Sequence, residues 1–390
     1  MRFGVLDSWR GIAALLVALY RFQADGWLFH LPLVRHAALY VDFFFVLSGF
    51  VIAHAYFDRL KDRASLGNFL VRRFGRLWPL HFAMFLPFLA FELIRLATGA
   101  PDSHGEGVAP FVGYRAPGTI PVELAFLNSV GIYPTTGWNT PSWSISSEFW
   151  TYVLFGILCI PARRVMGAVS AVLVIVCLGL IWRFGPGHLD ITFAPGTLRC
   201  MAGFFAGVLV NLGWRAGQPS LASMRNSLGL AEIPMVIAVF AFVWFAGNQP
   251  LSLAAPFVFG AMVFVFAAEA GIVSRLMSGR AFRFVGELSY SIYMVALFVS
   301  LVSGRVLVAL AGRLGLNVSR EIEVLGENWE VFSFATPGVN DALALLYLAG
   351  ILIASWFTWR FVEKPGRRYF NALADRLTGA PAPQGTGQLP

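Results

Sequence analysis

The sequence is most constrained by ten apolar stretches, each long enough to cross the roughly 30 Å hydrocarbon core of a bilayer. Hydrophobic residues make up 57% of the 390 residues and charged residues only 13%, and the mean hydropathy is +0.69. Soluble domains carry about 25% charged residues, so this composition indicates a polytopic membrane protein. We therefore predict an all-α integral membrane protein, a bundle of about ten transmembrane helices. The expected spans are 10–30, 38–57, 78–98, 142–161, 166–184, 197–213, 229–247, 251–270, 286–309 and 341–361.

The charge distribution predicts how the chain is oriented. With ten spans, 20 of the 29 Lys and Arg residues fall in segments on one side, which the positive-inside rule assigns to the cytoplasm. Both termini are then cytoplasmic, and the Pro- and Gly-rich tail at 371–390 is expected to be disordered. Although the net charge is +8, the basic residues are distributed among short loops, so no nucleic-acid partner is predicted. Two long external loops, 99–141 and 310–340, are expected to form lids or binding surfaces.

The first two spans carry charges where charge is costly. Arg10 and Arg21 are 11 residues apart and would share one face of a helix, about 16 Å apart along its axis. Arg10 is then expected at the cytoplasmic mouth and Arg21 near the bilayer midplane, with Asp42 on the returning span. Ionisable residues inside a membrane usually mark a functional path, which makes all three candidate catalytic residues. The alternative is an ion pair that pins the two helices together.

A cytoplasmic run, VRRFGRLWPLHF, contains a candidate site for phosphates. Arg72 and Arg76 are four residues apart on one helix face, and Arg73 adjoins them. Guanidinium groups suit bidentate capture of phosphates, such as those of a nucleotide-bearing acyl donor. The alternative is that these residues only set topology and contact lipid headgroups.

The stretch WNTPSWSISSEFWTY brings polar groups to the external mouth of the fourth span. Ser144 and Glu148 lie four residues apart, so a hydroxyl and a carboxylate enter the membrane together. Glu148 is a candidate partner for Arg21 or Arg10, or a group that orients a reacting atom. Trp138, Asn139 and Trp143 precede it as candidate substrate-binding residues, although tryptophans here could instead form an interfacial belt.

A weaker candidate is the run GELSYSIYMVALF, where Tyr290 and Tyr293 lie three residues apart near a helix start. Their hydroxyls could bind a sugar or an acyl group. The three cysteines lie in apolar stretches and form no disulfide framework, and the six histidines show no metal-ligand spacing. No metal site is predicted.

Taken together, these motifs resemble the membrane-bound acyltransferase 3 family, bacterial enzymes that O-acylate sugars and related acceptors. The resemblance runs from LDSWRGIAALLVALY through VDFFFVLSGFVI, RRFGRLWPLHF, WNTPSWSISSEFW and LSYSIYM to FVEKPGRR, and so covers residues 1–370 as one transmembrane domain. It implies a ten-span bundle and an acyl-CoA donor (acetyl-CoA) from the cytoplasm. It also implies a glycan or lipid-linked glycan acceptor, contact with membrane lipids and a place in the bacterial inner membrane.

Two positions depart from the family pattern. The family has a histidine eleven residues after the first-span arginine, and here that position is Arg21; a second histidine position is Ala296. A guanidinium cannot accept a hydroxyl proton near pH 7, so Arg21 cannot be the base. Either the chain is inactive as written, or it uses another base, for which Asp25, Asp42 and Glu148 are candidates. The rival function is a non-catalytic protein that binds or translocates a lipid or glycan.

Overall fold

The structure is a computed structural model that describes residues 3–99, 109–132, 137–192, 195–316, 318–324, 327–334 and 336–377. Within these ranges, seven helical segments are long and apolar enough to cross a membrane, and β-structure is limited to one hairpin. This confirms an all-α membrane fold, while the exact number of spans and their sidedness remain predictions. The seven segments are Ala37–Tyr56, Arg63–Thr98, Arg163–Phe184, Gly196–Ala216, Ser223–Ala246, Arg280–Arg313 and Pro337–Leu377.

A helix overlaps each of the ten expected spans. These helices are α1 (Gly4–Tyr20), α4 (Tyr40–Tyr56), α5 (Arg63–Thr98), α7 (Ser142–Cys159), α8 (Met166–Phe184), α9 (Gly196–Ala216), α10 (Gln218–Ala246), α11 (Ala255–Phe266), α13 (Arg280–Arg313) and α14 (Pro337–Thr358). Shorter elements connect them: α2 (Trp27–His30), α3 (Pro32–Arg35), α6 (Ile120–Leu124), α12 (Ile272–Met277), β1 (Ser319–Val324) and β2 (Glu327–Phe332). A π-helical turn (Trp359–Glu363) joins α14 to α15 (Lys364–Leu377).

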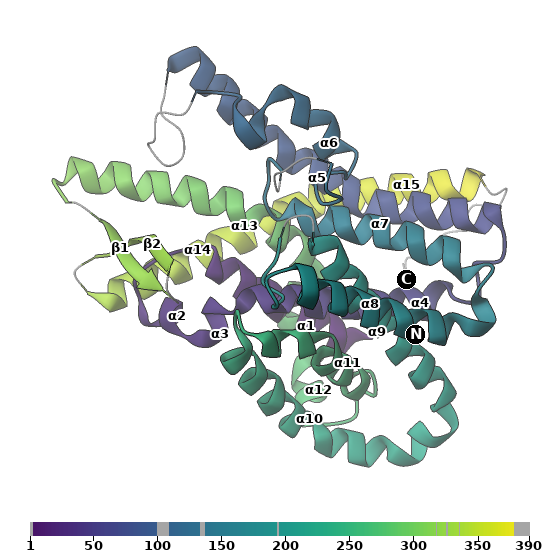
Figure 1. Ribbon diagram of the computed structural model, residues 1–390. Helices are drawn as coiled ribbons and strands as arrows, with labels where there is room; N and C mark the ends of the chain where they lie inside the picture. Colours follow the sequence, from purple (N-terminus) through teal and green to yellow (C-terminus); the bar gives the residue numbers. More distant parts are fainter. Residues whose placement is uncertain are drawn as a thin grey trace.

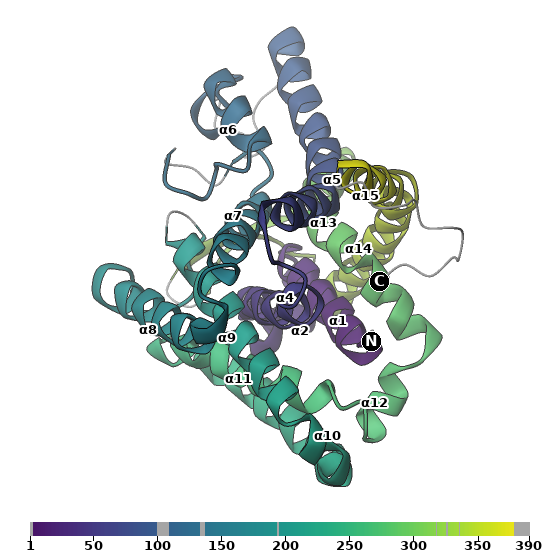
Figure 2. The ribbon, with the colours of Figure 1, turned by 90° about the vertical axis from the view of Figure 1, so that its right-hand side faces the viewer.

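The hairpin β1–β2 lies with α2 and α3 at one end of the bundle, and α15 lies at the other end (Figure 1). Viewed along the bundle, α1 and α4 are central and are surrounded by α5, α7, α9 and α13 (Figure 2). Residues 371–377 of the expected disordered tail belong to α15, and residues 378–390 lie outside the described part of the chain. The chain is helical there because α15 packs closely against α5. A Cβ atom added to Gly75 of α5 would overlap the side chain of Phe370 of α15.

The expected first span, 10–30, is not one helix. Helix α1 ends at Tyr20, and the chain then pairs with the hairpin: the Asp25 amide donates to the Phe332 carbonyl at 2.7 Å, and the Phe332 amide donates to the Gln23 carbonyl at 2.8 Å. These bonds satisfy backbone groups that a longer helix would have satisfied internally. Arg21 therefore lies at the end of α1 that faces the hairpin, rather than in the middle of a long span.

Glycines allow the central helices to approach closely. A Cβ on Gly49 of α4 would lie 1.8 Å from the Phe204 carbonyl oxygen of α9, and a Cβ on Gly11 of α1 would lie 2.6 Å from the Gly286 amide nitrogen of α13. Small residues at such crossings let backbones pack without intervening side chains, as is usual for helices in membranes. The two crossings hold α1 and α4 in place beside the cavity described next.

Candidate functional site

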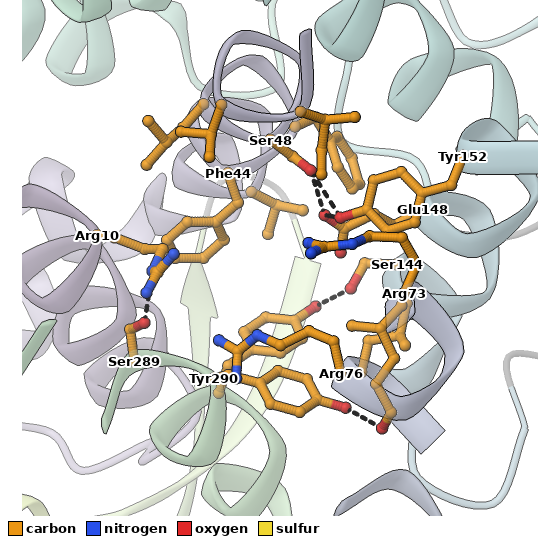
Figure 3. A pocket seen from close by; sticks show the side chains of 18 residues that line it. Arg10, Phe44, Ser48, Arg73, Arg76, Ser144, Glu148, Tyr152, Ser289 and Tyr290 are labelled. Carbon is orange, nitrogen blue, oxygen red and sulfur yellow. Dashed lines mark hydrogen bonds between the residues drawn. The ribbon is translucent and has the colours of Figure 1, made fainter. Parts of the chain in front are cut away.

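A cavity of about 150 Å³ lies between α1, α4, α5, α7 and α13 (Figure 3). Seven of the thirteen site residues predicted from the sequence line it: Arg10, Arg73, Arg76, Ser144, Glu148, Tyr290 and Tyr293. Three further polar residues, Ser48, Tyr152 and Ser289, also line it and were not predicted. The remaining wall is apolar and comes mainly from α4. The cavity therefore combines cations, one carboxylate, hydroxyls and a hydrophobic side.

Glu148 supplies the only carboxylate among the described residues that line the cavity. Ser48 donates a hydrogen bond to Glu148 Oε1 at 2.6 Å, and the Tyr152 hydroxyl donates to the same oxygen. The two hydroxyl oxygens are 2.8 Å apart. Glu148 and Tyr152 lie one turn apart on α7, whereas Ser48 comes from α4. Both hydroxyls hold the carboxylate in one orientation, and no ion pair engages it within the described residues.

Arg10 is fixed against the start of α13. Its Nε donates to Ser289 Oγ at 2.7 Å, a terminal nitrogen donates to the Gly286 carbonyl at 3.3 Å, and a terminal nitrogen lies 3.3 Å from Asp7 Oδ1. The close packing of Gly11 on Gly286 explains why these groups meet. Arg10 thus presents a cation to the cavity with its orientation set by neighbouring helices.

The three arginines of the α5 run have different surroundings. Arg73 stacks over the Tyr56 ring at 5.2 Å and donates to its hydroxyl at 3.1 Å, and no carboxylate of the described chain forms an ion pair with it. Arg76 is paired with Glu363 and stacks over the Tyr290 ring at 5.2 Å. Of the three, Arg73 is the cation most available to an anionic ligand.

Glu363 comes from the π-helical turn, which directs it into the bundle, where it also accepts a hydrogen bond from Ser291 Oγ at 2.9 Å. Arg72 does not line the cavity. It pairs with Asp375 of α15, and its Nε donates to Asn68 Oδ1 at 2.8 Å. The predicted phosphate cluster is therefore split between the cavity and the contact of α5 with α15.

One end of the cavity is closed by hydroxyls and aromatic rings. The Ser144 and Tyr293 hydroxyl oxygens are 2.9 Å apart, and the Tyr290 hydroxyl donates to the Leu77 carbonyl at 2.6 Å. Phe44 packs edge-on against Tyr293, with 6.1 Å between ring centroids. The predicted tyrosines thus line the cavity, but both hydroxyls already have partners within the protein.

Asp42 lies outside the cavity, in a fully buried ion pair with Arg199 of α9. Two nitrogens of Arg199 donate to its two carboxylate oxygens at 2.9 and 2.7 Å. Arg199 also donates to the Ala38 carbonyl at 2.6 Å and stacks over Trp143 at 5.6 Å. This bidentate pair joins α4 to α9, so Asp42 and Trp143 belong to a structural contact. Sequence reasoning missed Arg199 because it considered only acids near Arg21.

Arg21 does not line the cavity, and the expectation that an acid neutralises it is wrong. It has no ion pair among the described residues, and its guanidinium lies 6.0 Å from the centre of the Tyr20 ring. Asp25 instead lies 2.8 Å from His30 Nε2, while Asp42 and Glu148 have the partners given above. Each of these acids is thus engaged by a partner other than Arg21.

At the second departure, Ala296 is buried, and its carbonyl accepts a hydrogen bond from the Tyr347 hydroxyl at 3.0 Å. The same hydroxyl is 3.1 Å from the Ala18 carbonyl. Tyr347 of α14 therefore contacts the backbones of both α1 and α13 beside the two positions at which the sequence departs from the family pattern.

Trp138 and Asn139 are buried in the loop between α5 and α7 rather than in the cavity. The Trp138 amide donates to Glu123 Oε2 at 3.2 Å, and Ser142 Oγ donates to Glu123 Oε1 at 2.8 Å. Asn139 Nδ2 donates to the Met294 carbonyl at 3.2 Å. Burial raises the pKa of Glu123, a residue of the loop between α5 and α7, to about 7. In the structure these residues anchor the loop on the bundle.

Comparisons with known proteins agree with this picture. The model of a family described as "Acyltransferase domain" matches residues 3–360. The chain is 27% identical to the acyltransferase MdmB of Streptomyces mycarofaciens, over 94% of this chain and 92% of that protein. It is 22% identical to the peptidoglycan O-acetyltransferase OatA of Listeria monocytogenes, over 95% of this chain but only 57% of OatA.

A shorter similarity, 38% identity over 26% of the chain, links it to "Protein 2 in picA locus" of Rhizobium radiobacter, of which it covers 54%. No solved structure matches. The family match covers most of the chain, and the fold contains the apolar helices and the polar cavity that membrane acyl transfer requires. The protein therefore belongs to this acyltransferase family, as a multi-pass membrane transferase of acyl groups other than aminoacyl groups.

Proposed function

We propose that the protein is an O-acyltransferase of the bacterial inner membrane that moves an acyl group, in the first instance acetyl, from acyl-CoA to a hydroxyl of a cell-envelope glycan or glycolipid. The observation that carries this proposal is Glu148, a carboxylate held by two hydroxyls in a cavity that also presents Arg10 and Arg73. The name of the OatA relative, a peptidoglycan O-acetyltransferase, supports an envelope acceptor.

In the proposed reaction Glu148 is the general base. Its carboxylate takes the proton of the acceptor hydroxyl, and the acceptor oxygen attacks the thioester carbonyl carbon, so that a C–O bond forms. Arg10 is the cation that stabilises the negative charge developing on the carbonyl oxygen. The C–S bond then breaks, and the CoA thiolate takes the proton from Glu148. The products are an O-acyl ester and free CoA, and the carboxylate is regenerated.

Arg73 is the proposed contact for the donor phosphates, because it faces the cavity without a carboxylate partner in the described chain. Arg76 is held by Glu363 and serves to shape the site beside Tyr290. The rival, non-catalytic function drew its main support from Arg21, which cannot act as a base; the proposal assigns that role to Glu148 instead.

The test is release of free CoA from acetyl-CoA by the purified protein in lipid nanodiscs, with a bacterial envelope glycan fraction as acceptor. The Glu148→Gln variant should lose roughly a hundredfold or more in rate, the usual contribution of a general base. The matched control is Glu321→Gln, an exposed position on β1 that does not line the cavity, which should retain activity. Undiminished transfer by Glu148→Gln would refute the assignment of the base.

A further inference from the structure

Helix α4 presents one continuous face to the cavity. Val41, Phe44, Ser48 and Val51 recur at helical spacing along this face, and all four line the cavity. Within residues 41–50, only Phe44 and Ser48 are half-buried, and the other residues are buried. The face therefore shows how the cavity runs along the helix.

Exposure along this face shows which end of the cavity is open. Val51 is 39% exposed, whereas Val41 is only 5% exposed. The open end lies toward Tyr56, the last residue of α4, and Arg73 contacts Tyr56 there. The closed end lies near Val41, where Tyr293 and Ser144 are hydrogen-bonded to each other.

The chemical character of the cavity lining changes from the open end to the closed end. The open end carries Arg73, and the middle carries Glu148 bound to Ser48. Beyond Ser48 the lining is mainly apolar, with Val41, Phe44, Phe45 and Ile145. In the view of Figure 3, the side chains of Phe44 and Arg10 lie on the same side of the cavity. A donor with its phosphates at Arg73 and its thioester beside Glu148 has its acyl chain directed toward Phe44.

We propose that Phe44 sets the length of the acyl chain that the enzyme accepts, and that it restricts the donor to short acyl groups. This inference rests on the proposed function, because it assumes an acyl-CoA donor. Ser48 and Phe44 are four residues apart on the helix, about 6 Å along the axis, so only a short chain fits between the carbonyl position and the ring. Phe44 packs against Tyr293 and cannot move aside without disturbing it.

The experiment measures binding, so it does not depend on turnover or on the acceptor. Calorimetry would compare CoA with its S-ethyl, S-butyl and S-hexyl thioethers, on the full chain in nanodiscs. The unmodified protein should bind S-hexyl-CoA more weakly than S-ethyl-CoA. In Phe44→Ala the ratio of S-hexyl to S-ethyl affinity should rise at least about tenfold, because a single methylene in an apolar pocket already changes affinity by about that factor and the two chains differ by four. Affinity for CoA itself should be unchanged.

Two further variants keep the result interpretable. Phe44→Trp should weaken S-butyl-CoA binding without weakening that of CoA. Phe257→Ala makes the same change as Phe44→Ala on the exposed surface of α11 and should leave every affinity unchanged. If CoA binds but the ratio of S-hexyl to S-ethyl affinity does not rise in Phe44→Ala, the chain-length assignment is refuted while the donor site stands. If no CoA compound binds the unmodified protein, the donor site itself is refuted, and the inference with it.

Discussion

At the scale of single residues, the functional question comes down to which charged groups remain available to a ligand. Asp42 is paired with Arg199, and Arg72 is paired with Asp375. In contrast, Arg73 and Glu148 both line the cavity, and neither forms an ion pair in the described chain. A buried ion pair is a poor source of catalytic groups, because separating it leaves an uncompensated charge in a medium of low dielectric constant.

Arg21 provides the first prediction. Because it lies at the end of α1 and outside the cavity, replacing it with alanine should leave acyl transfer within a few-fold of the unmodified protein. Arg21→His should give no gain, since the side chain at this position does not line the cavity that holds Glu148. The measurement is acceptor-dependent CoA release, compared with Glu148→Gln. A large rise in rate for Arg21→His would show that position 21 reaches the reacting groups.

Arg73 provides the second prediction, with Arg72 as its matched control on the same helix. Arg73→Ala should weaken CoA binding by about ten- to a hundredfold, because one charge-assisted hydrogen bond contributes about 1.5–3 kcal/mol. Arg72→Ala should have little effect on CoA affinity, because Arg72 is engaged by Asp375 and does not line the cavity. Calorimetry would measure the CoA affinity of both variants. Equal losses in both variants would mean that the donor phosphates lie at the surface of α5 instead.

At the scale of elements, much of the fold was predictable from the sequence, but the pairing of charges was not. Hydropathy located the helices because each apolar stretch is a local property of the chain. The nearby sequence does not determine that α1 ends at Tyr20, because this end depends on hydrogen bonds to Phe332, more than 300 residues later. The partners Arg199 and Ser48 were missed for the same reason: nothing in the surrounding sequence shows which helices cross beside Asp42 or Glu148.

Helix crossing gives the third prediction. Gly49→Ala should destabilise the protein by about 1–3 kcal/mol, the usual cost of overpacking, because the added methyl group would overlap the Phe204 carbonyl of α9. Gly179→Ala on α8 is the control, since nothing lies within 4 Å of its added Cβ. Thermal unfolding monitored by loss of monodispersity would show a lower midpoint for the first variant alone. Equal midpoints would contradict the close approach of α4 and α9.

The loop that precedes α7 gives the fourth prediction, a dependence on pH. The pKa of Glu123 is about 7 in the folded protein, above the 4.5 of an unfolded glutamate, because burial disfavours the charged carboxylate. The folded state then binds more protons between these values, so stability is greatest below pH 4.5 and falls as the pH rises toward 7. Glu123→Gln should remove this part of the slope, measured as unfolding midpoint between pH 5 and 8. A wild-type slope that persists in the variant would exclude Glu123 as its source.

At the scale of the whole molecule, the open question is which end of the bundle faces the cytoplasm. The distribution of basic residues places both termini there, and the proposed donor route through the Arg73 end of the cavity requires it. Cysteines introduced at Ser65 and Thr378 should resist a membrane-impermeant thiol reagent in intact cells, whereas one at Ser103 should react. Labelling of the Ser65 variant from outside would reverse the orientation and with it the donor route.

The π-helical turn between α14 and α15 has a consequence for the register of the last helix. Such a turn holds one more residue than the α-helical turn it replaces, so everything after it is rotated by about 100° relative to an uninterrupted helix. Deleting one residue from Trp359–Glu363 would undo that rotation. Glu363 would then leave Arg76, and Phe370 would leave the groove at Gly75. A single extra residue thus sets the rotation of α15 about its axis. Through Glu363 it also fixes Arg76, a cavity-lining residue about 290 residues earlier in the chain.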